Sequence, residues 1–574
     1  MILHAQAGDK FVLNIDRATF RVLGWPKPRR IRGRTISIAG HLARGSIETL
    51  DAYHRLALAY EKDGASFSRD LLGQFCAAVV DPTARTVILS QDSLGLGKMF
   101  YEITPDSITI SSDLDLLYSV TGRKGLCEAY FAFHMTATSA DRSLTPFEGI
   151  YRLAHGWTIT ISSRGLNWTR PWSPSQRSCH PVEDDLEDQF RSLLDEAVKS
   201  TLPSQGRVLC ELSGGLDSSS VFATARNFAK DVGAVTYVAD RGMAGDDELY
   251  ADRMIEHCPA PLHRVSIDTG EVIPNGYGGF VSEPHAILYA RQFDAMDRYF
   301  REASVDVVLS GAVGDVIFEY AGIPPAFIAD AIHYRSWRRA VRTAREWAAG
   351  RANVRSWTHY LLQIGLPLAR RHRRGKSVLD SRKRQIPDWL VPSFGLRHGL
   401  HNFDPPQRAP RVAEPGRQHL WESVYDLAAF ENGPLYRRLS ADFRYPLYFR
   451  PLVEFMLNLD FRERRGITGD RRLQRRALGD RLPEAILTRT SKGSAQELRE
   501  RHLMESDRWY ALMTQNPRIV QRGWADAEKW RALVDRARVG ASEYSAAFVN
   551  AIQTELWLRA LERVDAPPPV NLVA

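Results

Sequence analysis

Residues 210–221 read CELSGGLDSSSV, and they join two segments of different character. The apolar run VLCEL at 208–212 leads into two glycines, an aspartate and three serines, after which VFATA at 221–225 favours a helix. Glycines directly after a buried strand let backbone N–H groups approach an anion closely, and the start of the next helix adds partial positive charge. The stretch therefore predicts a phosphate-binding turn between a strand and a helix.

The side chains of this turn indicate a nucleotide that is bound together with a metal ion. Ser213, Ser218 and Ser219 can donate hydroxyls to phosphate oxygens, whereas the Asp217 carboxylate faces phosphate favourably only through a bridging Mg²⁺. A Walker loop places a lysine on the β- and γ-phosphates, and no lysine follows these glycines. The turn therefore suits pyrophosphate held as a leaving group, with attack on the α-phosphate of ATP. A serine-rich helix N-cap is the purely structural alternative.

Further along the chain, amphipathic helical patterns alternate with short apolar runs. The predicted strands are AVTYVA at 234–239, HRVSI at 263–267 and DVVLS at 306–310, and LEDQFRSLLDEAVKS at 186–200 predicts a helix before the turn. Strands spaced by helices imply right-handed crossovers and a parallel sheet, with ligands at the carboxyl ends of its strands. Beyond Tyr320 the pattern is almost wholly helical, broken by a Pro- and Arg-rich stretch at 366–416.

The N-terminal part has a different pattern. Short β-branched runs predict strands at TISIAG (35–40), TVILSQD (86–92), SITISSD (107–113) and WTITISS (157–163), with a helix in SIETLDAYHRLALAYEKDG (46–64). Prolines and polar residues at 170–185 interrupt all periodicity, which indicates a linker. At 574 residues the chain exceeds one compact core. We therefore expect an α+β domain at 1–175 and an α/β domain at 186–574.

Composition excludes several classes of protein. The chain is 44% hydrophobic and 25% charged, which is typical of a folded protein, and its five cysteines lack the CxxC spacing of a zinc site. No signal sequence or bilayer-spanning run is visible, so we expect a cytoplasmic protein without a membrane partner. The net charge is +8, and the basic stretch at 369–385 has no interleaved aromatic residues. It favours a solvated face over a nucleic-acid partner.

Several motifs together resemble the asparagine synthetase family of ATP-pyrophosphatases, over nearly the whole chain. SGGLDSS at 213–219 is similar to the pyrophosphate loop of that family. Other matches in family order are DDELYADRM (246–254), VVLSGAVGD (307–315), DFRYPLYFRPLVEFMLNL (442–459) and LPEAILTRTSKG (482–493). LLGQFCAAVVDPTARTVILSQDSLGLGKMFY (71–101) and TPFEGIYRLAHG (145–156) resemble the glutaminase half. The resemblance implies an N-terminal glutaminase-like sandwich of Ntn type. It also implies a C-terminal PP-loop synthetase domain, similar to the adenine nucleotide alpha hydrolases, with a large helical part.

The chain departs from this family at its N-terminus. Family amidotransferases release ammonia from glutamine with a cysteine that becomes the first residue once methionine is removed, and here Ile2 stands in that place. An alkyl side chain cannot form the covalent intermediate, so we expect a glutaminase fold without glutaminase chemistry. Two related classes fit such a chain, the β-lactam synthetases and the lasso-peptide macrolactam synthetases. Both adenylate a carboxylate that an amine of the same molecule then attacks.

The segment SGAVGD at 310–315 distinguishes these classes. Three residues before Asp315, asparagine synthetases carry a glutamate and β-lactam synthetases carry a tyrosine that belongs to a base, whereas this chain has Ala312. Alanine neither accepts nor relays a proton. A lasso-type cyclase remains, in which an Asp or Glu side chain of a precursor peptide is activated and its N-terminal amine closes the ring. The large helical half is compatible with a peptide in a wide cavity.

The resemblance also implies roles for individual residues. Asp217 and Asp315 would share Mg²⁺ on the phosphates of ATP, and Lys492 resembles the family lysine that steadies the adenylation transition state and the oxyanion. For Lys492 an exposed loop lysine is the alternative. The residues expected to bind the nucleotide are Leu212, Ser213, Gly214, Gly215, Leu216, Asp217, Ser218, Ser219, Ser310 and Gly311. Leu212, Ser310 and Gly311 are expected on the ribose and adenine side.

Other groups and other functions stay open at this point. Asp247 belongs to an acidic cluster that a helix N-cap explains equally well, and Glu283 and His285 could supply a base but are more typical of a structural pair. The expected partner is a precursor peptide, with a leader peptidase and a leader-binding protein as further partners to test. The alternatives are an asparagine synthetase fed by free ammonia, a β-lactam-synthetase-like cyclase of a small molecule, and a noncatalytic peptide-binding scaffold.

Overall fold

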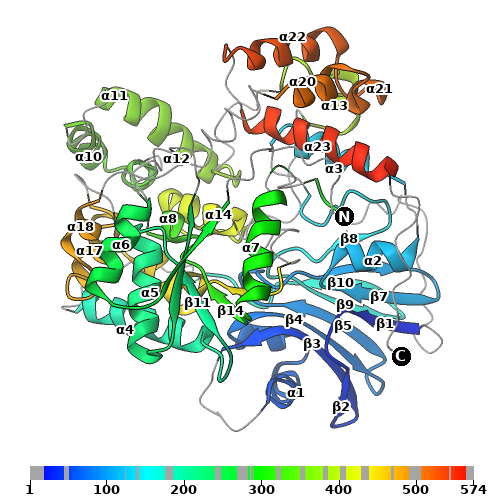
Figure 1. Ribbon diagram of the computed structural model, residues 1–574, viewed down its shortest axis with the longest axis horizontal. Coiled ribbons are helices and arrows are strands. Elements are labelled where there is room, and N and C mark those ends of the chain that lie inside the picture. The colour runs from blue at the N-terminus through cyan, green and yellow to red at the C-terminus, as the bar shows by residue number, and fades with distance from the viewer. Residues whose placement is uncertain are drawn as a thin grey trace.

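The computed structural model places a β-rich N-terminal part beside a second part in which helices surround a smaller sheet, with the last helices lying over the N-terminal part (Figure 1). The residues that it describes are 19–43, 51–122, 125–137, 141–174, 185–238, 247–267, 282–284, 288, 290–318, 325–349, 356–378, 386–400, 409–427, 439–466, 471–489, 506–541 and 545–563. Within these ranges, no helix combines the length and the apolar character needed to span a bilayer.

Two sheets form the N-terminal part. One has the strand order β10-β9-β5-β4-β3-β2 and is antiparallel throughout, and the other has the order β1-β7-β6-β8 with β1 and β7 parallel. The strands are β1 (Thr19–Leu23), β2 (Arg29–Ile31), β3 (Arg34–Leu42), β4 (Gly73–Asp81), β5 (Thr86–Gln91), β6 (Phe100–Ile103), β7 (Ser107–Ser111), β8 (Tyr151–Arg152), β9 (Thr158–Ser162) and β10 (Gly165–Thr169). The four predicted runs at 35–40, 86–92, 107–113 and 157–163 coincide with β3, β5, β7 and β9.

Strand β4 shows how the layers are stacked. Phe75 and Val79 point into a core under α1 (Ala52–Asp63), whereas Cys76 and Ala78 point into a second core that they share with residues of β7 such as Ile110. Alternate residues of a strand face opposite sides of its sheet, so the larger sheet is covered by α1 on one side and by the smaller sheet on the other. The expected layered α+β arrangement is confirmed, and the assignment to the Ntn type stays a prediction.

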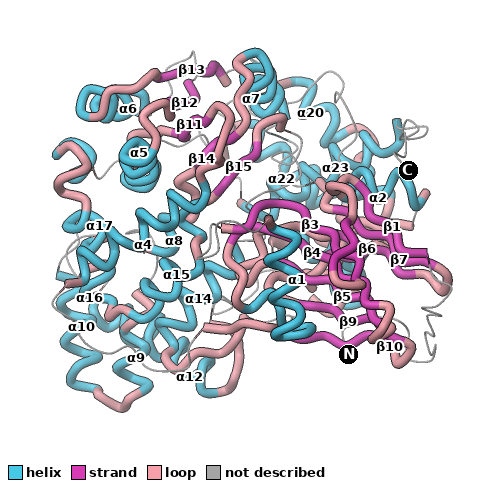
Figure 2. The backbone as a smooth tube through the Cα atoms, turned by 90° about the horizontal axis from the view of Figure 1, so that it is seen from below, coloured by secondary structure: helices cyan, strands magenta, loops and turns pink. Residues whose placement is uncertain are grey.

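The second part is built on a five-stranded parallel sheet with the order β13-β12-β11-β14-β15. Its strands are β11 (Val208–Glu211), β12 (Gly233–Val238), β13 (Leu262–Ser266), β14 (Val307–Leu309) and β15 (Asp442–Arg444). Helix α4 (Leu186–Thr201) precedes the first strand of this sheet, and the crossover helices are α5 (Leu216–Phe228), α6 (Asp247–His257) and α7 (Ala290–Glu302). Helices α5 and α6 cover one face and α7 covers the other (Figure 1, Figure 2). The predicted parallel sheet is confirmed.

One strand of this sheet lies where the sequence predicted only helices. Strand β15 is three residues long and pairs with β14, with the Asp442 N–H donating to Asp306 O at 2.8 Å and the Ser310 N–H donating to Arg444 O at 2.9 Å. So short a run carries no periodicity, and its extended state depends on the partner strand. The expectation of an almost wholly helical pattern beyond Tyr320 therefore has one exception in the described residues, the short strand β15.

The remaining elements are mainly helices. They are η1 (Gly64–Arg69), α2 (Leu114–Thr121), α3 (Glu128–Met135), α8 (Gly314–Ile317), α9 (Ile328–His333), α10 (Trp337–Ala349), α11 (Trp357–His359), η3 (Tyr360–Gly365), α12 (Leu366–Arg373), α13 (Pro392–Arg397), α14 (Pro415–Leu427), η6 (Pro446–Tyr448), α15 (Arg450–Asn458), α16 (Phe461–Arg464), α17 (Arg472–Ala477), α18 (Glu484–Thr488), α20 (Asp507–Thr514), α21 (Arg518–Gln521), α22 (Ala527–Arg538) and α23 (Ala546–Arg563).

The last helices pack on the N-terminal part of the chain. Helix α23 lies against α3 (Figure 1), and Phe131 of α3 stacks on Trp524 with ring centroids 5.0 Å apart. Trp557 of α23 joins the same core, which also holds Leu23 and Phe147 from the N-terminal part. The two ends of the chain therefore share one hydrophobic core. The boundaries proposed at 1–175 and 186–574 stay a prediction.

Candidate nucleotide-binding site

The predicted phosphate-binding turn lies at the centre of the parallel sheet. Strand β11 lies between β12 and β14. After β11 the chain adds β12 and β13 on one side of it, and then adds β14 and β15 on the other side. Such a switch of strand order opens a crevice at the carboxyl ends of the strands. The turn at 212–215 starts in this place and leads directly into α5.

Serine hydroxyls fold the turn onto the first residues of α5. The Ser213 Oγ accepts from Gly215 N–H at 3.3 Å and lies 3.2 Å from Ser218 Oγ, which in turn donates to Gly215 O at 3.1 Å. The Ser213 side chain is exposed, whereas Leu212, Leu216 and Ser219 are buried. Ser213 and Ser218 therefore present hydroxyls beside the helix N-terminus, and Ser219 lies within the helix packing.

Gly214 sits where no other residue fits. Its φ is +63°, and a Cβ built on it would lie 2.3 Å from the Cβ of Tyr250 in α6. The left-handed conformation and this close approach both require glycine.

We expect Gly214→Ala to weaken MgATP binding by about tenfold or more, because an αL alanine costs about 1–2 kcal/mol and its methyl would also displace the turn from α6. Gly399→Ala is the matched control, since Gly399 has φ +68° and an added Cβ would meet nothing within 4 Å. Titration calorimetry with MgATP on both full-length variants measures the difference. Equal MgATP affinities in the two variants would contradict this role of Gly214.

The two aspartates predicted to hold Mg²⁺ are brought together. Asp217 stands in the first turn of α5 and Asp315 in the first turn of α8, and a Cβ on Gly314 would lie 2.1 Å from Asp217 Cγ. The guanidinium of Arg471 contacts both carboxylates, with its Nη2 3.2 Å from Asp217 Oδ2 and also paired with Asp315 Oδ1. Gln474 Nε2 donates to Asp217 Oδ1 at 3.1 Å.

This arrangement fits a divalent cation that is shared with phosphate groups. Two carboxylates from different elements already converge on one positively charged atom of Arg471. Within the described ranges, no group of three or more His, Cys, Asp or Glu side chains could hold a metal, so oxygens of the nucleotide would complete the coordination. Mg²⁺ is commonly held in this way, by one or two carboxylates together with substrate phosphates.

Sequence reasoning missed Arg471 and Gln474. They belong to DRRLQRRA at 470–477, a run whose charges suggest a solvated face. In the structure Arg471 is 6% exposed and has φ +52° at the start of α17. A left-handed, buried arginine directly before a helix leaves no signal in the sequence pattern, because other residues of the same run, such as Arg476, remain in solvent.

The segment that precedes Lys492 also contacts the turn, through Arg489. The buried Arg489 donates from Nη1 to Ser213 O at 3.0 Å and from Nη2 to Asp247 Oδ1 at 2.5 Å, and its guanidinium lies 4.1 Å from the ring centroid of Tyr250. Asp247 therefore has a structural partner beside the turn. Lys492 lies outside the described residues, and so do Ile2 and His285.

The segment after β14 closes the site from the other side. A Cβ on Gly311 would lie 2.6 Å from Ser218 N, so the backbone of this segment touches the start of α5. Ser310 Oγ accepts from Ala312 N–H at 3.2 Å, and Val313 has φ +74°, which is rare for a β-branched residue. Ala312 packs against the main core. The remaining predicted candidate for a base, Glu283, pairs with Arg152 of β8.

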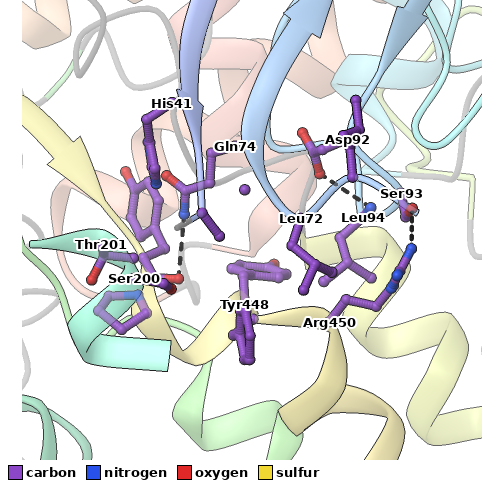
Figure 3. Close-up of a pocket in the computed structure, with 16 residues that line it drawn as sticks. His41, Leu72, Gln74, Asp92, Ser93, Leu94, Ser200, Thr201, Tyr448 and Arg450 are labelled. Carbon is purple, nitrogen blue, oxygen red and sulfur yellow. Dashed lines mark hydrogen bonds between the residues drawn. The ribbon is translucent and has the colours of Figure 1, made fainter. Parts of the chain in front are cut away.

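A separate cavity lies between the two parts of the chain. This partly open cavity has a volume of about 20 Å³ and lies between β3, β4 and the segment around η6, with His41, Gln74 and Tyr448 around it (Figure 3). Burial lowers the pKa of His41 to about 3, with a smaller effect of the same sign from Arg444, so its imidazole is neutral. Gln74 Nε2 donates to Tyr445 O at 3.3 Å. None of the residues that form the phosphate-binding turn lines this interface cavity.

Comparison with known proteins gives a consistent set of relatives. Residues 189–559 match the family described as asparagine synthase, and residues 51–173 match the glutamine amidotransferase domain.

Asparagine synthetase [glutamine-hydrolyzing] 2 of Bacillus subtilis (strain 168) is 25% identical over 230 residues, which are 37% of this chain and 30% of that protein. Asparagine synthetase [glutamine-hydrolyzing] 3 of the same bacterium is 26% identical over 304 residues, 47% of this chain and 46% of that protein. The carboxyethyl-arginine beta-lactam-synthase of Streptomyces clavuligerus is 25% identical over 293 residues, 49% of this chain and 54% of that protein. The chain thus spans less than two thirds of the length of each of these relatives.

Proposed function

Since the chain belongs to the asparagine synthase family, we propose that it is an AMP-forming carbon–nitrogen ligase that closes a macrolactam in a ribosomally made precursor peptide. A side-chain carboxylate of an Asp or Glu in the peptide attacks the α-phosphate of ATP, and pyrophosphate leaves. The N-terminal amine of the same peptide then attacks the acyl adenylate, an amide bond forms, and AMP leaves. The observation that carries this chemistry is the convergence of Asp217 and Asp315 on one cationic group beside the SGGLDSS turn.

The proposed role of each residue in the site follows from the charge or polarity of its side chain. Asp217 and Asp315 would hold Mg²⁺, which supplies charge neutralisation to the phosphates when bound. The Ser213 and Ser218 hydroxyls and the start of α5 bind pyrophosphate oxygens, and Arg471 adds a fixed positive charge at the same place. Lys492 would steady the negative charge that develops on the carboxyl oxygen.

Two features favour an intramolecular reaction over the use of ammonia. Ala312 offers no proton acceptor. The helical elements that follow α8 are more extensive than a small substrate requires, which supports a peptide. A β-lactam-type cyclisation of a small molecule is the second candidate, because the beta-lactam-synthase of Streptomyces clavuligerus matches over 54% of its own length.

The test uses the full-length protein with MgATP and the peptide encoded by a short reading frame beside its gene. We expect the peptide to lose the mass of one water while AMP and pyrophosphate accumulate, and glutamine to remain unhydrolysed. A peptide with an acetylated N-terminus should still support pyrophosphate exchange without ring closure, and a peptide with an amidated acceptor should support neither. Formation of asparagine from aspartate and ammonia, or of ADP, would contradict the proposal. A leader peptidase and a leader-binding protein are partners to add in the same assay.

A further inference from the structure

The carboxylate of Glu211, beside the turn at 212–215, has no role in the site described above. Glu211 is the last residue of β11 and lies two positions before Ser213. Tyr237 of β12 donates its hydroxyl to Glu211 Oε1 at 3.0 Å, and Ser310, directly after β14, also favours the charged form of the Glu211 carboxyl, which lowers its pKa. The neighbouring parallel strands β11 and β12 therefore supply the acid and a donor at the carboxyl edge of the sheet.

The charge of the Glu211 carboxylate is unfavourable for the stability of the fold at this position. Its neighbours in sequence, Cys210 and Leu212, are buried and apolar, and within the described ranges no cation compensates the charge of Glu211. Burial raises the pKa of the Glu211 carboxyl above its ordinary value, and the hydrogen bonds from Ser310 and Tyr237 oppose that shift. Packing alone would favour an apolar side chain at this partly buried position, because an acid that loses hydration without gaining a cation is destabilising.

The carboxylate keeps capacity for further donors on a ligand. A carboxylate accepts at about four lone-pair positions, and Tyr237 uses one of them. Two residues of strand span about 7 Å, so Glu211 lies about that far along the chain from Ser213 and the phosphates. In ATP the part that adjoins the α-phosphate is the ribose, and its two neighbouring hydroxyls are donors at the spacing of a carboxylate.

We propose that Glu211 accepts hydrogen bonds from the ribose hydroxyls of the bound nucleotide, and thereby selects a ribonucleotide over a deoxyribonucleotide. This inference rests on the proposed function in taking ATP as the nucleotide. Tyr237 acts as a positioning residue, because its hydroxyl holds the Glu211 carboxylate in place from the neighbouring strand. Ser310, on the opposite neighbouring strand, also favours the charged form of the carboxyl and lowers its pKa.

The experiment is a titration of the full-length protein with ATP, 2′-deoxy-ATP and 3′-deoxy-ATP in the presence of Mg²⁺ and without peptide. We expect at least one deoxy analogue to bind the wild-type protein about tenfold or more weakly than ATP, which is the size of one lost hydrogen bond to a charged group. In Glu211→Leu the affinity for ATP should fall by the same factor, while the affinity for that analogue stays unchanged. Glu196→Gln, which alters an exposed acid on α4, is the control and should keep the discrimination.

The outcomes separate this inference from the proposed function. Equal losses for all three nucleotides in Glu211→Leu would mean a structural role and overturn the inference, and so would a wild-type protein that binds all three equally. A failure of the folded wild-type protein to bind ATP would contradict the proposed function, and this inference with it. Tyr237→Phe should reduce the discrimination without abolishing ATP binding.

Discussion

Replacing Asp217 with Asn is expected to lower pyrophosphate release by about 10²- to 10³-fold, the size of losing one preorganised charge beside a transferring phosphoryl group. Asparagine has nearly the same shape, and its side-chain oxygen can still accept from Gln474 Nε2, which now donates to Asp217 Oδ1 at 3.1 Å. Arg471 would keep its contact with Asp315. The fold should therefore survive while the negative charge required by Mg²⁺ is reduced.

The first measurement is the release of pyrophosphate from MgATP in the presence of peptide. The second is the Mg²⁺ concentration needed for half-maximal MgATP binding, and this concentration should rise in Asp217→Asn. Asp231→Asn is the matched control, because Asp231 is exposed just after α5 and far from the turn along the same helix. Full activity of the Asp217→Asn protein, or the appearance of ADP as the product, would mean that SGGLDSS does not hold pyrophosphate as a leaving group.

Replacing Lys492 with Met should lower turnover by about 10²-fold while MgATP still binds, because Met keeps the apolar stem and removes only the charge. Lys492 itself lies outside the described residues. The same segment ends, within the described part, at Arg489, whose guanidinium donates to Ser213 O at 3.0 Å. This contact ties the segment to the phosphate-binding turn and supports the choice of Lys492 over other lysines.

AMP formation at saturating MgATP measures turnover, and titration with MgATP measures binding. Lys529→Met is the control, since Lys529 is exposed on α22. A reduction of kcat with unchanged nucleotide affinity is the pattern of a group that acts in the transition state. An unchanged kcat would leave Lys492 as an exposed loop lysine and direct attention to Arg489.

The strand, the turn and the helix at 208–228 were predictable because each depends on neighbouring residues. An apolar run, two glycines and a helical pattern encode strand, turn and helix within a few positions, and the helical spacing between later runs implies a parallel sheet. The N-terminal layers were predictable for the same reason, since β-branched alternation marks strands with two different faces. The family resemblance added the expected roles of Asp217, Asp315 and Lys492.

Long-range contacts were not predictable, because they depend on packing between distant segments. Arg471 meets Asp315 across 156 positions and Gln474 meets Asp217 across 257. An arginine run has the same composition whether its side chains face solvent or a pair of partly buried carboxylates. The strand β15 and the packing of α23 on α3 were missed on similar grounds.

The sequence by itself determined that a turn rich in glycine and serine follows a buried strand, that this turn carries an acid and no lysine, and that an alanine stands at position 312. These are properties of single positions and of their near neighbours. Only the tertiary structure decided that Asp217 and Asp315 converge on Arg471 and that Glu211 meets Tyr237. Such contacts form because parallel strands bring their carboxyl ends to one edge, and side chains far apart in the chain meet there.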